Sequence, residues 1–335
     1  MSHPRVLAVH PFHAVEGARI DVLGEGFPID PSGLPEVRVG NVVARVVFAS
    51  PTCIGVLVPS GLAEGGRVPV RVAGISGETA FVAVGTTFAT GLHQVDSPAF
   101  DADGNLYVTY SGTRGQQVPV SIFRVLANGT RETFSSGIVN PTSMTVGPDG
   151  ALYVSSRFEG TVYRLDAEGT AHPFAKDLGV SCGLAFASDG TLFVGDRSGT
   201  IFKVDPSGEA AAFVSLPASV AAFHLAVAPD GVLVVTGPTL SPHDGIYQID
   251  PAGNVTMHHV HFGRPQGVAF DASGALYVVE ALAGLSGLYR LRPGEPSELV
   301  LAGPGLLGVA FNPGGGLVVC SSETAYRFAR YDWNR

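Results

Sequence analysis

Gly183-Leu-Ala-Phe-Ala-Ser-Asp-Gly-Thr-Leu-Phe-Val194 is one of six copies of a motif in which an apolar strand enters a tight turn and a second apolar strand leaves it. Gly267-Val-Ala-Phe-Asp-Ala-Ser-Gly-Ala-Leu-Tyr-Val278 is another well-formed copy. The turn glycines follow one another at spacings of 46, 40, 41, 43 and 41 residues, and they are Gly104, Gly150, Gly190, Gly231, Gly274 and Gly315. A period of this length predicts a repeat architecture with one supersecondary unit per repeat.

Each repeat continues beyond this motif into two further strands. In the second repeat, residues 161–166 form an expected third strand, and residues 171–175 form a fourth after a turn at Gly169. Four short antiparallel strands in about 40 residues are typical of a β-propeller blade. A single blade exposes apolar surface on both faces, which only neighbouring blades can bury. The sequence therefore predicts an all-β protein with a six-bladed propeller over residues 85–335.

The last repeat supplies only three strands, ending with residues 324–329. Residues 86–91, Thr-Thr-Phe-Ala-Thr-Gly, resemble the fourth strands of other repeats, such as residues 132–137. We therefore expect residues 86–91 to pair with the C-terminal blade and close the ring, because an open array would leave strand edges exposed. This places the domain boundary near Gly85.

Residues 1–84 lack the repeat and contain about seven short apolar or alternating segments, which predict an immunoglobulin-like β-sandwich. Val9-His-Pro11, Gly24-Glu-Gly-Phe27 and Ser50-Pro-Thr52 lie at the turns between them. With these motifs the segment resembles the IPT/TIG family of immunoglobulin-like domains. The resemblance implies a domain that mediates packing or adhesion and carries no catalysis.

The composition limits the classes of partner. Hydrophobic residues make up 45% and charged residues 15% of the chain, with 44 Gly and 24 Pro, as in all-β proteins with many short strands. The net charge of −9 and the lack of a Lys/Arg cluster argue against nucleic acid or an anionic membrane as partner. Cys53, Cys182 and Cys320 are too few and too scattered for a disulfide framework or a Cys-rich zinc site.

The sequence as given begins without the charged and apolar pattern of a signal peptide. It contains no apolar run of 18 residues, so no transmembrane helix is expected. We expect a cytoplasmic protein, or a secreted one if a signal peptide has been removed.

The repeats resemble the NHL-repeat and gluconolactonase (regucalcin)-like propellers through Pro265-Gln-Gly-Val-Ala-Phe-Asp271, the turn glycines and Leu276-Tyr-Val278. The resemblance covers the C-terminal 250 residues. It implies the fold and leaves the activity open, because such propellers include lactonases, lyases and binding modules.

Candidate site residues come from the inner-strand starts and from the loops after the second strands, which gather on one face of a propeller. Three of them, His224, Asp196 and Glu280, are candidate catalytic residues because carboxylates with a histidine can do acid–base work or hold a cation. The alternative is that Asp196 pairs with Arg157 or Arg197 and that His224 packs inside the channel mouth. Arginines also suit an anionic ligand. The candidate ligand-binding residues are Asp96, Arg157, Arg197, Gln266, His243 and Arg264.

The resemblance to lactonases implies a divalent cation, such as Ca²⁺, held in the channel by a Glu, Asn residues and an Asp. Asp96-Ser97 stands here in place of the Glu motif, Cys182 in place of an Asn, and Gln266 at a further ligand position. If the protein is an enzyme of this kind, the metal ligands are Asp96, Asp196 and Glu280. If it is not, no cofactor is expected.

The segment Met257-His-His-Val-His261 resembles a zinc-binding motif. However, side chains alternate along a strand, so only His259 and His261 share a face. We expect an outer strand here.

Three functions remain open. The first is a non-enzymatic propeller that binds a small molecule or a protein at the channel face, with the sandwich as an interaction domain. The second is a lactonase-like hydrolase or a lyase, which acts in the channel with a divalent cation. The third is a structural subunit of a larger assembly, including self-assembly.

Overall fold

The computed structural model describes residues 3–29, 33–62, 64–75, 79–93, 96–282, 284 and 286–329, and of residues 259 and 260 the backbone alone. Within these ranges the chain forms 32 β-strands and no helix. Accordingly, none of the described segments is a helix that could cross a membrane.

The N-terminal strands form the predicted immunoglobulin-like sandwich. In β3 the side chains of Ile20 and Val22 are fully buried while Arg19 and Leu23 face solvent, as period-two alternation requires. Because β5 pairs with both β4 and β6, it joins the two sheets around one core. The strands are β1 (Arg5–His10), β2 (His13–Ala14), β3 (Arg19–Glu25), β4 (Val37–Val39), β5 (Val42–Ala49), β6 (Cys53–Leu57), β7 (Gly66–Val72) and β8 (Ala80–Val84).

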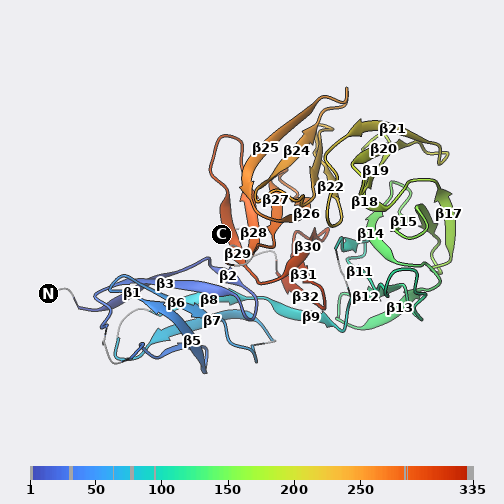
Figure 1. The fold of residues 1–335 in the computed structure, drawn as a ribbon. Helices are drawn as coiled ribbons and strands as arrows, with labels where there is room; N and C mark the ends of the chain where they lie inside the picture. The colour runs from blue at the N-terminus through green and yellow to red at the C-terminus, as the bar shows by residue number, and fades with distance from the viewer. Residues whose placement is uncertain are drawn as a thin grey trace.

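The remaining strands form a propeller-like ring of antiparallel sheets (Figure 1). Four separate four-stranded sheets follow the chain order: β10 (Ala99–Phe100), β11 (Leu106–Thr109), β12 (Ile122–Val125) and β13 (Arg131–Ser135); β14 (Pro141–Val146), β15 (Leu152–Ser156), β16 (Thr161–Leu165) and β17 (Ala171–Ala175); β18 (Ser181–Phe186), β19 (Leu192–Asp196), β20 (Thr200–Val204) and β21 (Ala210–Ser215); β22 (His224–Val227), β23 (Leu233–Thr236), β24 (Asp244–Ile249) and β25 (Val255–Phe262).

The fifth separate sheet combines strands from both ends of the ring. It contains β30 (Leu306–Phe311), β31 (Leu317–Ser321), β32 (Thr324–Phe328) and β9 (Thr86–Thr90). β9 pairs antiparallel with β32, from Thr90 opposite Thr324 to Thr86 opposite Arg327. The predicted pairing of this segment with the C-terminal repeat is thus confirmed.

The strands β26 (Pro265–Phe270), β27 (Leu276–Glu280), β28 (Gly287–Leu291) and β29 (Glu298–Ala302) have the same antiparallel order but are not a separate sheet. They form one end of a 12-stranded sheet that continues into the sandwich. The six turn glycines therefore correspond to five separate sheets and one run of strands shared with the N-terminal domain.

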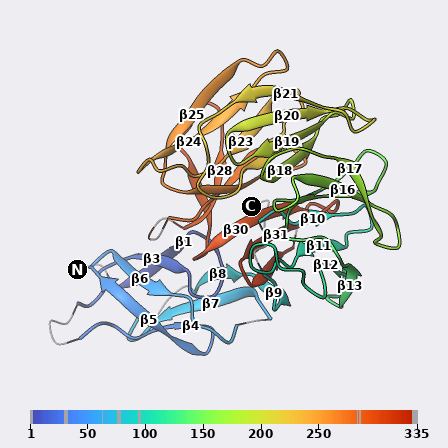
Figure 2. The same ribbon diagram turned by 45° about the vertical axis from the view of Figure 1, so that its right-hand side comes forward.

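The two residues of β2 make this connection. β2 runs parallel to β8 of the sandwich on one side and to β29 of the ring on the other. Beyond it, the Val15 amide donates to the Ala302 carbonyl at 3.0 Å, and Val15 is buried among propeller side chains such as Leu301 and Leu306. Figures 1 and 2 both place the sandwich at one side of the ring, next to these strands. The sequence predicts adjoining domains with a boundary near Gly85, but it does not predict a shared sheet.

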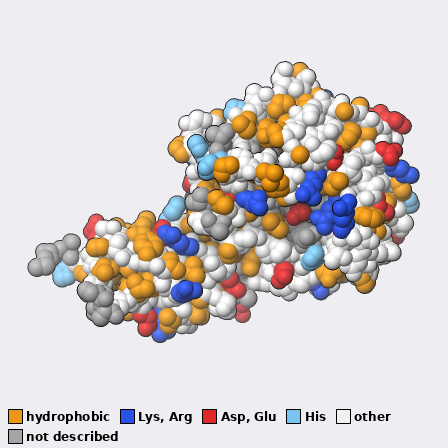
Figure 3. All heavy atoms as spheres, viewed as in Figure 1, with side chains coloured by type: hydrophobic (Ala, Val, Ile, Leu, Met, Phe, Trp, Pro, Cys, Tyr) orange, Lys and Arg blue, Asp and Glu red, His pale blue; other side chains and the backbone are white. Residues whose placement is uncertain are grey.

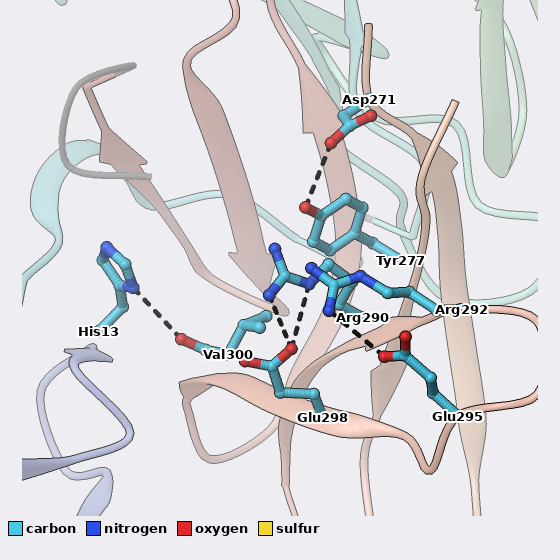
Figure 4. Close-up of polar contacts among 8 residues, drawn as sticks. All are labelled: His13, Asp271, Tyr277, Arg290, Arg292, Glu295, Glu298 and Val300. Carbon is cyan, nitrogen blue, oxygen red and sulfur yellow. Dashed lines mark hydrogen bonds and ion pairs between the residues drawn. The ribbon is translucent and has the colours of Figure 1, made fainter. Parts of the chain in front are cut away.

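Apolar side chains of neighbouring sheets bury one another, as the repeat model requires. Val234 and Ile246 of one sheet, for example, share a core with Val278 and Leu291 of the next strand run. The turn at Gly274 is stabilised by its own side chains. Asp271 accepts hydrogen bonds from the amides of Ser273 and Ala275 and from the Tyr277 hydroxyl (Figure 4). Asp271 therefore acts as a turn former.

Candidate functional site

A channel of about 290 Å³ runs along the ring axis between the inner strands. Asp96, Ser97 and His224 line the end where the inner strands begin, and Phe100, Phe186 and Phe311 line the end where they finish. Between them the wall consists mostly of Val, Ala and Leu side chains. Most of the polar side chains that line the channel therefore lie at one end of it, where the inner strands begin. The propeller face seen in Figure 3 carries Lys and Arg side chains around its centre.

His224 is the best-defined polar group of this mouth. Its side chain begins β22, is 2% exposed, and places Nε2 3.2 Å from Oε1 of Gln266. Because an amide oxygen only accepts hydrogen bonds, this contact assigns the ring hydrogen to Nε2 and leaves Nδ1 as an acceptor. Nδ1 is buried and has no hydrogen-bond partner among the described residues.

Burial lowers the pKa of His224 to about 4, although the hydrogen bond to Gln266 and the nearby backbone of Asp96 act in the opposite direction. The imidazole is therefore neutral at pH 7. Gln266 is itself held in place, since its backbone carbonyl accepts a hydrogen bond from the Thr236 hydroxyl. The two predicted site residues thus form one fixed pair.

Asp96 and Cys182 form a second part of the mouth. Burial raises the pKa of Asp96 to about 7, while the Arg157 guanidinium favours the ionised carboxylate. Burial, together with the charge of Asp96, raises the pKa of the Cys182 thiol to about 12 despite Arg157 and Arg197 nearby. The Cys182 Sγ donates to the Val180 carbonyl at 3.1 Å. Cys182 is therefore a neutral thiol in a polar neighbourhood and not a thiolate nucleophile.

The carboxylate of Glu280, a candidate catalytic group, accepts hydrogen bonds from backbone amides. Its Oε2 accepts from the Gly263 amide at 2.7 Å, and its Oε1 accepts from the amides of Arg264 at 2.9 Å and Leu282 at 2.7 Å. The side chain is 1% exposed. Three backbone donors therefore occupy both oxygens of this carboxylate, which fixes the segment that enters β26.

Asp196 stands six residues after the turn glycine of its repeat, as Glu280 does in its own repeat. Its carboxylate accepts from the Val180 amide at 2.8 Å and from the Ser198 hydroxyl. The alternative prediction that Asp196 pairs with Arg197 is also not realised, because the Arg197 guanidinium donates to the carbonyls of Ser219 and Val220. The carboxylates of Asp196 and Glu280 thus both hold backbone segments at the starts of inner strands.

In another repeat, a serine at the same position also forms a hydrogen bond to the backbone segment that enters the inner strand. Ser156, six residues after its turn glycine like Asp196 and Glu280, donates its hydroxyl to the Val139 carbonyl in the segment entering β14. Next to this segment, buried Asn140 donates to the carbonyls of Gly112 and Thr113 and accepts from the Gly115 amide. This positioning role was not predicted, although the sequence carries a signal for it: Ser156, Asp196 and Glu280 each follow the turn glycine of their repeat by six residues.

The remaining candidate residues differ in their exposure. His243 and Arg264 are exposed, and Arg264 contributes only its backbone amide to the Glu280 contact. Arg157 is half-buried near Asp96. In the strand β25, His258 and His261 are exposed, as an outer strand requires, while the side chain of His259 lies outside the described residues.

Asp96, Asp196 and Glu280, the predicted metal ligands, do not come together. Across the described ranges no group of three His, Cys, Asp or Glu side chains has an arrangement that could hold a metal ion. The physical reason is visible at Asp196 and Glu280, whose oxygens are directed to backbone amides of their own sheets. These three carboxylates therefore do not form a cation site together.

Comparison with known proteins supports the two-part fold. Residues 4–89 match the IPT/TIG domain model. None of the curated proteins matches the sequence. Among solved structures, an auxiliary nutrient binding protein from Bacteroides thetaiotaomicron is 13% identical with a TM-score of 0.58, and the match covers 98% of each chain.

Two enzymes are also similar in fold. A gluconolactonase from Xanthomonas campestris is 15% identical with a TM-score of 0.59, covering 89% of this chain and 98% of that one. A catalytically inactive His-to-Ala variant of virginiamycin B lyase from Staphylococcus aureus, with quinupristin, is 14% identical with a TM-score of 0.54, covering 88% of this chain and 100% of that one. At such identities the likeness shows the β-propeller fold and no activity.

Proposed function

We propose that the protein is a ligand-binding propeller that takes a small polar molecule at the channel mouth, with the sandwich as a rigidly attached interaction domain. The observation that carries this proposal is the buried His224–Gln266 pair with its open acceptor at Nδ1. A ligand hydroxyl or amide hydrogen would satisfy that acceptor, because an unpaired buried polar atom costs about 1–3 kcal/mol.

The charges of the mouth favour an anionic group on the same ligand. Arg157 and Arg197 both act on the Cys182 thiol, which places their guanidinium groups near the His224 end of the channel. Two guanidinium groups suit a carboxylate. We therefore infer a hydroxylated carboxylic acid, such as a sugar acid, as the ligand class.

The match that covers 98% of both chains is to a protein described as nutrient-binding, and its span includes both parts of this fold. This supports ligand binding as one use of the combined architecture. We further infer that β26–β29 act as a sixth blade, because their order and pairing repeat those of the five separate sheets.

A hydrolase or lyase is the second candidate. In it, His224 would use Nδ1 as a general base, and the similarity to a lyase that is inactive as a His-to-Ala variant supports this possibility. A base with a pKa of about 4 is weak at neutral pH, which favours the binding function.

Calorimetric titration with gluconate, combined with a hydrolysis assay on its lactone, separates the two candidates. For the binding function, gluconate binds to the wild type, His224→Asn and Arg157→Ala each weaken binding by about tenfold or more, and the lactone is not turned over. His243→Asn is the matched control, because His243 is exposed. Lactone turnover that His224→Asn abolishes would establish the enzyme instead, and neither binding nor turnover would overturn both.

A further inference from the structure

A second cavity lies where the sandwich meets the ring, and it is separate from the channel. It has a volume of about 370 Å³ and takes its walls from both parts of the chain. The sandwich side contributes Phe12, His13 and Arg67, and the ring side contributes Arg290, Glu298 and Leu299. Figure 4 shows part of this junction, with His13 directed to Val300 and Arg290 directed to Glu298. Clefts between domains are frequent ligand sites.

The cavity has more positive than negative groups. The Arg290 guanidinium is paired with Glu298, at 2.7 Å between Nη2 and Oε2. Arg67 is exposed, stacks at 4.3 Å over the Phe81 ring, and forms no ion pair with any described carboxylate. The lining thus contains two guanidinium groups and one carboxylate, in a chain whose net charge is −9. The planar guanidinium group of Arg67, which lies over the Phe81 ring, suits a planar anion such as a carboxylate.

The rest of the wall is mostly apolar, with the exposed His10 and the buried His13 as its other polar side chains. His13 is 6% exposed, its Nδ1 lies 3.3 Å from the Val300 carbonyl, and its ring packs edge-on against Phe12 at 5.1 Å. Val9, Phe12 and Leu299 supply hydrophobic surface. A ligand that fits both halves of this lining needs one anionic group and a compact hydrophobic body.

We propose that the junction cavity binds a small carboxylic acid with an aromatic or branched apolar body. The carboxylate lies on Arg67, and the apolar body lies against Phe12 and Leu299. Because the walls belong to both parts of the chain, such a ligand bridges the sandwich and the ring. This site is independent of the channel proposal, since none of its lining residues belongs to the channel.

Ligand-observed NMR titration of the full chain with benzoate tests the proposal. Benzoate is expected to bind saturably, and benzamide, its uncharged analogue, and inorganic phosphate, which lacks an apolar body, are expected to bind at least about tenfold more weakly. Arg67→Ala should lower benzoate affinity by about tenfold or more, the loss of one charge-assisted contact. Glu298→Gln should raise it, because it releases Arg290 for the ligand.

Arg71→Ala is the matched control, because Arg71 is an exposed arginine on the same strand as Arg67 but does not line the cavity. Since Arg67 is exposed, its replacement should leave the fold intact, and a thermal melt checks this. Benzoate binding that Arg67→Ala leaves unchanged overturns the proposal. Binding that disappears with Arg157→Ala, but not with Arg67→Ala, assigns benzoate to the channel and likewise overturns it.

Discussion

Nε2 of His224 lies 3.2 Å from Oε1 of Gln266, joining the first strands of two neighbouring units of the ring inside the channel mouth. This contact fixes the tautomer of the imidazole and leaves Nδ1 as the one ring atom with acceptor capacity. A neutral histidine held in this way recognises a hydrogen-bond donor better than it removes a proton. The arrangement suits selection of a ligand by its hydroxyl or amide groups.

Gln266→Leu removes the partner of Nε2 and should lower the free energy of unfolding by about 1–3 kcal/mol, the cost of a buried unpaired donor. Urea unfolding measures this change. The control is Gln248→Leu, because the Gln248 side chain is half-buried and has no hydrogen bond among the described residues. Equal stability of the wild type and Gln266→Leu would show that the contact does not hold His224.

His224 and Asp96 should impose opposite pH dependences on stability. The folded protein keeps His224 neutral, with a pKa of about 4 against 6.5, so the unfolded chain binds more protons between these values and the His224 contribution rises with pH. The pKa of Asp96 is raised from 3.8 to about 7, so the folded protein binds more protons in this window and the Asp96 contribution falls as pH rises.

Asp96→Asn should therefore steepen the rise of stability with pH between about 4 and 6.5, while His224→Asn should flatten or reverse it. Urea unfolding in steps across this window gives the slopes, and the difference from the wild type isolates each group from other titrating residues. Parallel curves for all three proteins would contradict both pKa shifts.

Glu280→Ala should destabilise the protein by about 2–4 kcal/mol, because it leaves three backbone amides without an acceptor. Glu280→Gln should cost less, since its oxygen can still accept from Arg264 and Leu282. Thermal and urea unfolding measure both, with exposed Glu295→Ala as the control. A variant at Glu280 that keeps full stability but loses ligand binding or turnover would return this residue to the functional site.

Gly85→Val should loosen the closing strand pair. A Cβ atom at Gly85 would lie 2.7 Å from the Phe328 ring, which is 3% exposed and has little room to move. Limited proteolysis should then cut near β9 much faster than in the wild type. Gly33→Ala serves as the control, because a Cβ there would meet nothing within 4 Å. Unchanged protease resistance would mean that the packing at this junction tolerates the added side chain.

The repeated strands and the closing role of residues 86–91 were predictable because each unit carries the same pattern, so a missing strand in one copy points to its replacement elsewhere. His224 and Gln266 were also predictable as neighbours, since both begin inner strands. The role of Glu280 was not, because residue type alone does not tell whether backbone amides of a distant loop point at a carboxylate. The shared sheet at β2 could not be predicted from the sequence either, because the backbone hydrogen bonds of two residues create no side-chain pattern.

The pairing of β9 with β32 also sets the order of events while the chain is being made. β9 leaves the ribosome before any sheet of the ring, and its partner β32 is made after all the other strands of the ring. Until then, β9 presents an unpaired edge, which is prone to wrong pairing. A chain cut short by an early stop codon would carry such an edge permanently, and it would be an exposed target for chaperones and proteases.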